Sequence, residues 1–150
     1  MIDFEYWVDN IVGTCELIES EDALRKVWIE GDHSITSIHY FDELYEQVLG
    51  DNHTEELIPV FAPRIADDNA IEALSQYVAA LHAVDAQIEG NPVLKDPAIL
   101  LASSEWNTFR QSAKRVVELP CFQEYRNGRK EREILNRLNA ERRESDAARG

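Results

Sequence analysis

The sequence predicts an all-α protein, folded as a single-domain irregular bundle of about five to seven helices over residues 1–150. Three observations favour this class. Apolar residues recur at helical spacing in two adjacent long segments, about 69–89 and 97–118. Several segments begin at a capping residue and end at a glycine or proline. No convincing pair of strands, internal repeat or low-complexity linker divides the chain.

The helix over about 69–89 is expected at the centre of the bundle. Asp67, Asp68 and Asn69 offer capping oxygens, and Gly90 followed by Pro92 ends the segment. Its large apolar residues follow one another at steps of three and four, which places them on one helical face. These residues are Ile71, Leu74, Val78, Leu81, Val84 and Ile88.

The next helix, over about 97–118, is expected to lie antiparallel to the first. Asp96 and Pro97 are typical of a helix N-terminus, and the segment stops before Pro120. Only a short turn separates the two helices, and short connections join antiparallel neighbours. The two helices therefore form a predicted central antiparallel pair.

Residues 1–12 allow two interpretations. Their apolar residues alternate as in a strand, yet Phe4, Trp7, Val8 and Ile11 also fit one helical face. The helix is favoured because no second strand is available to pair with this segment.

Shorter elements are expected between residue 12 and the central pair. One helix begins after Ser20 and closes at Gly31, and another covers about 40–49 and ends at Gly50. The segment 57–64 is apolar but holds two prolines, so it predicts a packed connector or one short turn.

The last segment, about 126–150, is expected to form a basic, partly frayed C-terminal helix. Residues 126–143 include seven basic and three acidic residues. The segment has only a thin stripe of large apolar residues, which predicts a helix that docks or extends into solvent. Its last seven residues are expected to be frayed. The large apolar residues of this stripe are Ile134, Leu135 and Leu138.

Charge is distributed unevenly along the chain. The 15 Lys and Arg against 29 Asp and Glu give a net charge of −14. Residues 1–99 hold 21 acids and 4 bases, a net of −17, whereas residues 100–150 hold 8 acids and 11 bases, a net of +3. An acidic body repels nucleic acid and anionic lipid and attracts basic proteins. A basic protein partner is therefore expected, and direct nucleic-acid binding is not.

The sequence predicts neither a membrane span nor a secretory signal. No run of 18 apolar residues could span a membrane, and the N-terminus lacks a basic region followed by an apolar stretch. Cys15 and Cys121 are too few for a disulfide scaffold. These observations predict a cytoplasmic protein.

The strongest arrangement of metal-ligating residue types is His33, His39, Asp42 and Glu46. The two histidines are six residues apart, a spacing that does not place both on one helical face. The two helices bearing Glu-x-x-His units that a carboxylate bundle uses to bind two irons do not occur in the sequence, and neither does a calcium-loop pattern. A metal-dependent enzyme at these four residues is retained as the third hypothesis, and no bound metal or cofactor is expected.

Nucleophilic catalysis has less support. Cys15 lies in an acidic stretch that raises a thiol pKa, and Cys121 lies near arginines but has no histidine beside it in the sequence. Ser103 and Ser104 are expected inside a helix, without the turn that exposes a serine nucleophile. Phosphate-binding glycine motifs are absent. The chain is therefore expected not to be an enzyme.

The leading hypothesis is an acidic protein-binding module. Carboxylates and aromatic residues alternate between residues 16 and 56, and protein interfaces use aromatic anchors beside charge. The favoured use is a bacterial immunity or antitoxin-type protein that covers the active surface of a basic toxin or nuclease. The expected partner-binding residues are Glu16, Glu19, Asp22, Asp32, Tyr40, Asp42, Glu43, Tyr45, Glu46, Asp51 and Glu55.

Two alternatives involve no catalysis either. In the first, the chain is a structural domain that self-associates through an apolar face and whose acidity serves solubility. A homodimer in which the basic tail contacts the acidic face of a second copy is a separate hypothesis. In the second, it is a phage-type mimic of nucleic acid with carboxylates placed like phosphates. A mimic of nucleic acid is expected to carry two rows of acidic residues spaced to follow a duplex. The uneven charge of this chain, with its basic tail, counts against that alternative.

Overall fold

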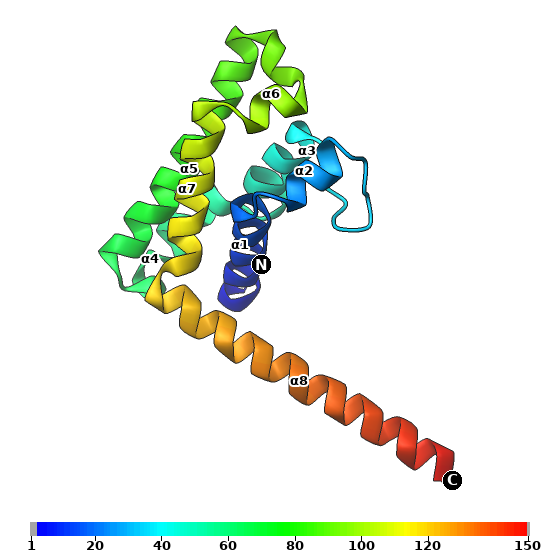
Figure 1. Ribbon diagram of the computed structural model, residues 1–150. Coiled ribbons are helices and arrows are strands. Elements are labelled where there is room, and N and C mark those ends of the chain that lie inside the picture. The colour runs from blue at the N-terminus through cyan, green and yellow to red at the C-terminus, as the bar shows by residue number, and fades with distance from the viewer. Residues whose placement is uncertain (1–2, 150) are drawn as a thin grey trace.

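The structure is a computed structural model that describes residues 3–149, with the side chains of residues 125–134, 136 and 149 left aside. Every regular element in this range is a helix, which confirms the predicted all-α class. The helices pack into one body from which the C-terminal helix projects (Figure 1). None of the helices formed by residues 3–149 combines the length and apolar composition that a membrane crossing requires.

The elements follow one another with short connections. In chain order they are α1 (Phe4–Glu19), α2 (Ala23–Trp28), α3 (Phe41–Glu46), the π-helical turn η1 (Gln47–Asp51), α4 (Thr54–Ile65), α5 (Asp68–Gly90), the 3-10 turn η2 (Pro92–Lys95), α6 (Pro97–Leu101), α7 (Ser104–Glu118) and α8 (Pro120–Arg149).

Helices α5 and α7 form the centre of the core and lie side by side (Figure 1). Tyr77 of α5 stacks on Phe109 of α7, with ring centroids 5.5 Å apart. Both side chains are fully buried. The Asp67 carboxylate accepts hydrogen bonds from the backbone N–H groups of Asn69 and Ala70, as expected for the cap of α5. The predicted antiparallel central pair is confirmed.

The second member of the pair is shorter than predicted, because residues 97–118 form two helices. Ser103 is not inside a helix: its hydroxyl donates to the Leu100 carbonyl at 2.7 Å and accepts from the Trp106 N–H at 3.2 Å. One side chain thus ends α6 and caps α7. The break turns α6 away from α7 toward α2, with which it packs.

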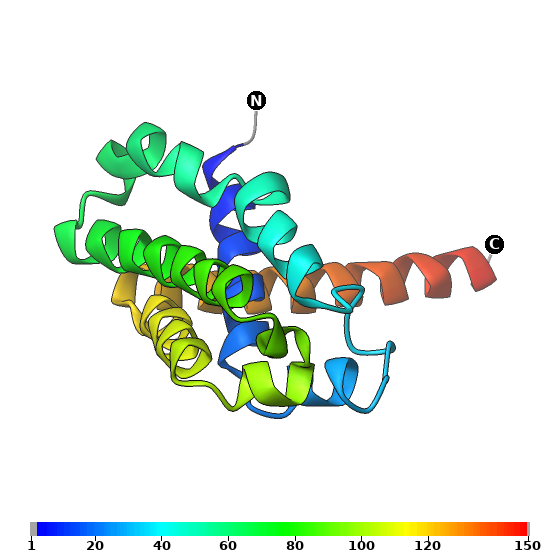
Figure 2. The ribbon, with the colours of Figure 1, turned by 90° about the horizontal axis from the view of Figure 1, so that it is seen from above.

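Helix α1 runs across the direction of α5 and packs on α7 (Figure 2). The Asp3 carboxylate caps it by accepting from the Tyr6 N–H at 2.8 Å. Its buried face includes Trp7, Ile11 and Ile18, which are at most 1% exposed. The helix predicted for the N-terminal residues is confirmed and continues to Glu19.

The prediction of a connector over residues 57–64 was wrong, because α4 is a helix that contains Pro59 and Pro63. Each interior proline removes one backbone hydrogen bond and costs about 3 kcal/mol. Apolar burial offsets that cost, since one face of α4 packs on the core. The packed side chains are Leu57, Ile58, Phe61 and Ile65.

Helix α8 begins at Pro120 rather than near residue 126, directly after Leu119 adopts an extended backbone. Its first turns pack on α7 and α1, with Phe122 buried, and the rest projects from the body (Figure 1). Leu135 and Leu138 are 58% and 52% exposed. Docking and extension into solvent were both predicted for this helix; its two exposed leucines favour extension, and the fraying of its last residues stays a prediction.

Candidate functional site

Five of the predicted interface residues line one surface pocket, which we call the acidic pocket. Its volume is about 330 Å³. Ser37, Ile38 and Gln47 complete its wall. The five predicted residues that line it are Tyr40, Asp42, Glu43, Glu46 and Asp51.

The π-helical turn η1 explains why these carboxylates share one face. Asp42 and Glu46 are four residues apart along α3, one helical turn. The next turn is closed by a 2.8 Å hydrogen bond from the Asn52 N–H to the Gln47 carbonyl, one residue wider than an α-turn. The extra residue brings Asp51 onto the same face as Glu46. Such π turns are rare and frequently mark functional sites.

Buried polar contacts fix the end of η1 against α1. Asn52 is 2% exposed, and its amide donates to the Thr14 hydroxyl at 3.0 Å. The Gln47 amide in turn donates to Asn52 Oδ1 at 3.0 Å. Because both ends of the buried amide are bonded, Asn52 holds the turn in a single position.

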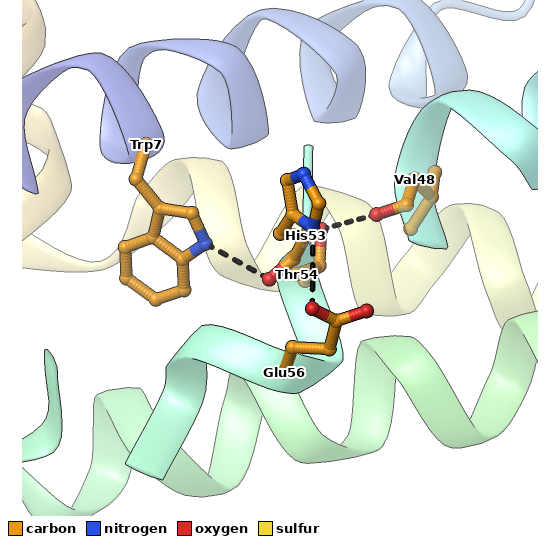
Figure 3. Close-up of polar contacts among 5 residues, drawn as sticks. All are labelled: Trp7, Val48, His53, Thr54 and Glu56. Atoms are coloured by element: carbon orange, nitrogen blue, oxygen red, sulfur yellow. Dashed lines mark hydrogen bonds and ion pairs between the residues drawn. The ribbon is translucent and has the colours of Figure 1, made fainter. Parts of the chain in front are cut away.

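The start of α4 is held by a second set of contacts, shown in Figure 3. The Trp7 indole N–H donates to the His53 carbonyl at 3.3 Å, and the Thr54 hydroxyl donates to the Val48 carbonyl at 2.8 Å. His53 adopts the left-handed backbone conformation, with φ 48°, and its imidazole lies 3.2 Å from a Glu56 oxygen. These contacts fix the start of α4 against α1 and η1, next to the acidic pocket.

Tyr40 is the aromatic residue of the acidic pocket and is 54% exposed. The neighbouring Glu43 carboxylate raises the pKa of the Tyr40 hydroxyl by its charge and by a hydrogen bond. Glu43 also accepts from the His39 N–H at 3.0 Å. In the described part of the chain, no Lys or Arg forms an ion pair with Asp42, Glu46 or the other carboxylates of this pocket. Among the described residues, these carboxylates are therefore not neutralised by an ion pair with Lys or Arg.

A second pocket of about 240 Å³, which we call the apolar pocket, adjoins the first. The two share Tyr40 and Asp42, so these side chains form the ridge between them. Lys95 lies at the wall of the apolar pocket. The rest of its lining is Trp28, Phe41, Ile88, Leu94, Pro97 and Leu100.

Tyr45 and Glu55 lie together elsewhere, around a histidine that the sequence analysis did not single out. The Tyr45 hydroxyl lies 3.3 Å from His82 Nδ1, and Glu55 Oε2 lies 3.4 Å from His82 Nε2. Desolvation, followed by the charges of Asp85 and Glu55, raises the pKa of Tyr45. The signal for this cluster was a single histidine in an alanine-rich helix, followed by Asp85 one turn later.

The remaining predicted residues are not gathered at either pocket. Glu16 and Glu19 are half-buried on α1, and Asp22 is exposed before α2. Asp32 is exposed in the following loop, where hydrogen bonds from the Ser34 hydroxyl and N–H lower its pKa. The continuous surface predicted over residues 16–56 is thus divided between several faces.

The four residues proposed as metal ligands form two separate pairs: the two histidines contact each other, and Asp42 and Glu46 line the acidic pocket. His33 and His39 stack face to face with ring centroids 3.8 Å apart. No group of three or more His, Cys, Asp or Glu among the described residues is placed to hold a metal ion. Stacked parallel rings direct their nitrogen lone pairs within their own planes. The contact is therefore a packing interaction.

Neither cysteine has the environment of an activated thiol. Burial raises the pKa of Cys15 strongly, since the side chain is fully enclosed. Partial burial and the charge of Asp67 raise the pKa of Cys121, despite the arginines near it in the sequence. Both thiols are favoured in their protonated form, which is a poor nucleophile.

Comparison of the chain with protein-family models, with curated proteins and with solved structures finds no match.

Proposed function

We propose that the protein is an acidic protein-binding module whose contact surface consists of the acidic and apolar pockets. The observation that carries this proposal is their common wall, formed by Tyr40 and Asp42. A partner that presents a Lys or Arg side chain next to an apolar side chain fills both pockets at once. The half-exposed Tyr40 ring between them is the kind of anchor that concentrates binding energy at protein interfaces.

The partner proposed on this basis is a basic protein. Unpaired carboxylates attract a basic surface at long range, which gives fast and salt-sensitive association. Nucleases and other toxins that act on nucleic acid have basic active surfaces, because they contact phosphates. The use that fits this chemistry is neutralisation, in which an immunity or antitoxin-type protein covers the active surface and performs no catalysis itself.

A pull-down from native lysate tests the proposal when it is run at low salt and at about 1 M salt, where the Debye length falls to about 3 Å. The Asp42→Lys/Glu46→Lys variant reverses two carboxylates of the acidic pocket. The Glu72→Lys/Glu118→Lys variant makes the same charge change at exposed positions outside both pockets. We expect the wild type and the control to retain a basic protein at low salt, and the pocket variant to lose it. Equal capture by all three would contradict the proposal.

A second candidate, self-association, is favoured by the exposed face of α8. Leu135, Leu138 and Arg142 are all exposed and follow at steps of three and four, so they share one helical face. Two leucines followed by an arginine complement an apolar pocket beside an acidic one. We propose a second copy of the chain as the occupant, with its α8 lying across both pockets.

Sedimentation velocity over a concentration series tests this candidate. Association that weakens in about 1 M salt, and that disappears in Leu135→Asp/Leu138→Asp, is the expected result. Val60→Asp, which alters an exposed apolar residue of α4, serves as the control and should associate like the wild type. A wild-type chain that stays monomeric at every concentration would exclude self-association.

A further inference from the structure

A third pocket, of about 310 Å³, lies between α2, α6 and α7 and shares no residue with the acidic or the apolar pocket. We call it the arginine pocket. Two arginines from different helices line it, Arg25 of α2 and Arg110 of α7, together with one acidic residue, Glu21. Arg25 is one of only four basic residues in the acidic segment 1–99, and Arg110 comes from the more basic segment that follows.

The two arginines differ in how they are held. Arg110 is 18% exposed, donates to Asn107 Oδ1 at 3.1 Å and lies 3.4 Å from a Glu21 oxygen. Glu21 is 76% exposed, so this ion pair is weak and easily displaced by another carboxylate. No acidic side chain of the described residues lies within ion-pair distance of Arg25. The pocket therefore offers one oriented guanidinium and one free guanidinium to an anion.

The rest of the pocket is lined largely by apolar side chains. Leu24, Leu101 and Trp106 form its wall together with Ile29, which is 43% exposed. Trp28 packs behind Trp106, with ring centroids 5.5 Å apart, and limits the movement of that wall. The polar side of the pocket holds Ser20 and Asn107 beside the charged residues, so the lining is apolar on one side and polar on the other. A concave site that combines an apolar wall with a few polar groups is the usual form of a small-ligand pocket, and a volume of about 310 Å³ lies at the lower end of the range for such pockets.

We propose that the arginine pocket binds a small organic carboxylate with an apolar tail. The carboxylate replaces Glu21 at Arg110 and takes Arg25 as its second cation, because guanidinium groups bind carboxylates through paired N–H donors. The tail lies against Trp106 and Leu101. This inference is independent of the proposed protein interface, since either surface functions without the other.

Octanoate and octanol are suitable probes, because they share one chain length and differ in charge. Isothermal titration calorimetry on the full chain should show octanoate binding at least about tenfold more tightly than octanol, the size expected for a charge-assisted contact. Octanoate should also change the tryptophan fluorescence, because Trp106 lines the pocket.

Three variants then locate the binding site. Arg25→Gln and Arg110→Gln should each weaken octanoate binding by about tenfold and leave octanol binding unchanged. Lys114→Gln removes an exposed charge of α7 outside the pocket and should bind octanoate as the wild type does. Arg25 is exposed and has no ion pair, so its variant keeps the test valid if Arg110→Gln misfolds. Equal binding of octanoate and octanol, an absence of octanoate binding at 10 mM (about 2.7 kcal/mol of binding free energy), or equal losses in all three variants would overturn the proposal.

Discussion

The buried amide of Asn52 donates a 3.0 Å hydrogen bond to the hydroxyl of Thr14, which joins the end of η1 to the middle of α1. Both residues are buried, at 2% and 7% exposure. Asn52 directly follows Asp51, which lines the acidic pocket. A polar contact in the core therefore determines where one wall of the surface pocket lies.

Replacing Asn52 by alanine should lower the free energy of unfolding by about 2–3 kcal/mol, because it removes the hydrogen-bond partner of the buried Thr14 hydroxyl and of the half-buried Gln47 amide. Urea unfolding followed by circular dichroism measures the change. Gln87→Ala on the exposed face of α5 is the control and should stay within about 0.5 kcal/mol of the wild type. A similar small effect of Asn52→Ala would show that water replaces the lost contacts.

Ser103 and Ser104 are neighbours with different predicted importance. Ser103→Ala removes the cap of α7 and should cost about 1 kcal/mol of unfolding free energy. Ser104→Ala lies in the first turn of the helix, is exposed and should have almost no effect. Equal effects of the two substitutions on the thermal midpoint would mean that the cap does not stabilise α7.

Sequence reasoning predicted α5 well because spacing, capping and termination all agree there. Five of the six side chains at steps of three and four are buried and Ile71 is half-buried, Asp67 caps the helix, and Gly90 is its last residue. The same reasoning missed the break at Ser103, since the apolar spacing continues across it. It also missed α4, because propensity disfavours Pro59 and Pro63 while tertiary burial decides the outcome.

The candidate site was predictable only where its residues lie on one local element. Asp42 and Glu46 share a face of α3, and their proximity follows from a spacing of four. Asp51 joins them through a π turn, and neither apolar spacing nor capping residues indicate such a turn. Glu16 and His82 belong to other helices, and their positions depend on how α1 and α5 pack against the rest of the chain.

Pro59→Ala should stabilise the protein. The alanine N–H restores the hydrogen bond to the Glu55 carbonyl that the proline ring cannot make, and Pro59 is exposed, so little packing is lost. Part of the gain is offset by the greater freedom of the unfolded chain, which leaves a net gain of about 1–2 kcal/mol. Differential scanning calorimetry would show a higher Tm. The matched substitution Pro120→Ala, at the first position of α8, should give no such gain.

Cys15 and Tyr77 form a buried pair of weak acids between α1 and α5, with the thiol against the phenol hydroxyl. Desolvation raises the pKa of both groups well above their ordinary values, so both stay protonated in the folded state. The unfolded chain releases these protons at the ordinary pKa values of about 8.5 for Cys and about 10 for Tyr. Above those values the unfolded state binds fewer protons than the folded state.

Stability should therefore fall as the pH rises above about 8.5, by up to about 1.36 kcal/mol per pH unit for each group. Below pH 8 neither group contributes, because both are protonated in the folded and the unfolded chain. Urea unfolding between pH 7.5 and 10.5 measures the slope. Cys15→Ala should flatten the curve between about pH 8.5 and 10, and Tyr77→Phe should flatten it above about pH 10. Cys121→Ala, at a half-buried thiol, should keep most of the wild-type slope. Parallel curves for all variants would show that the pair ionises without unfolding.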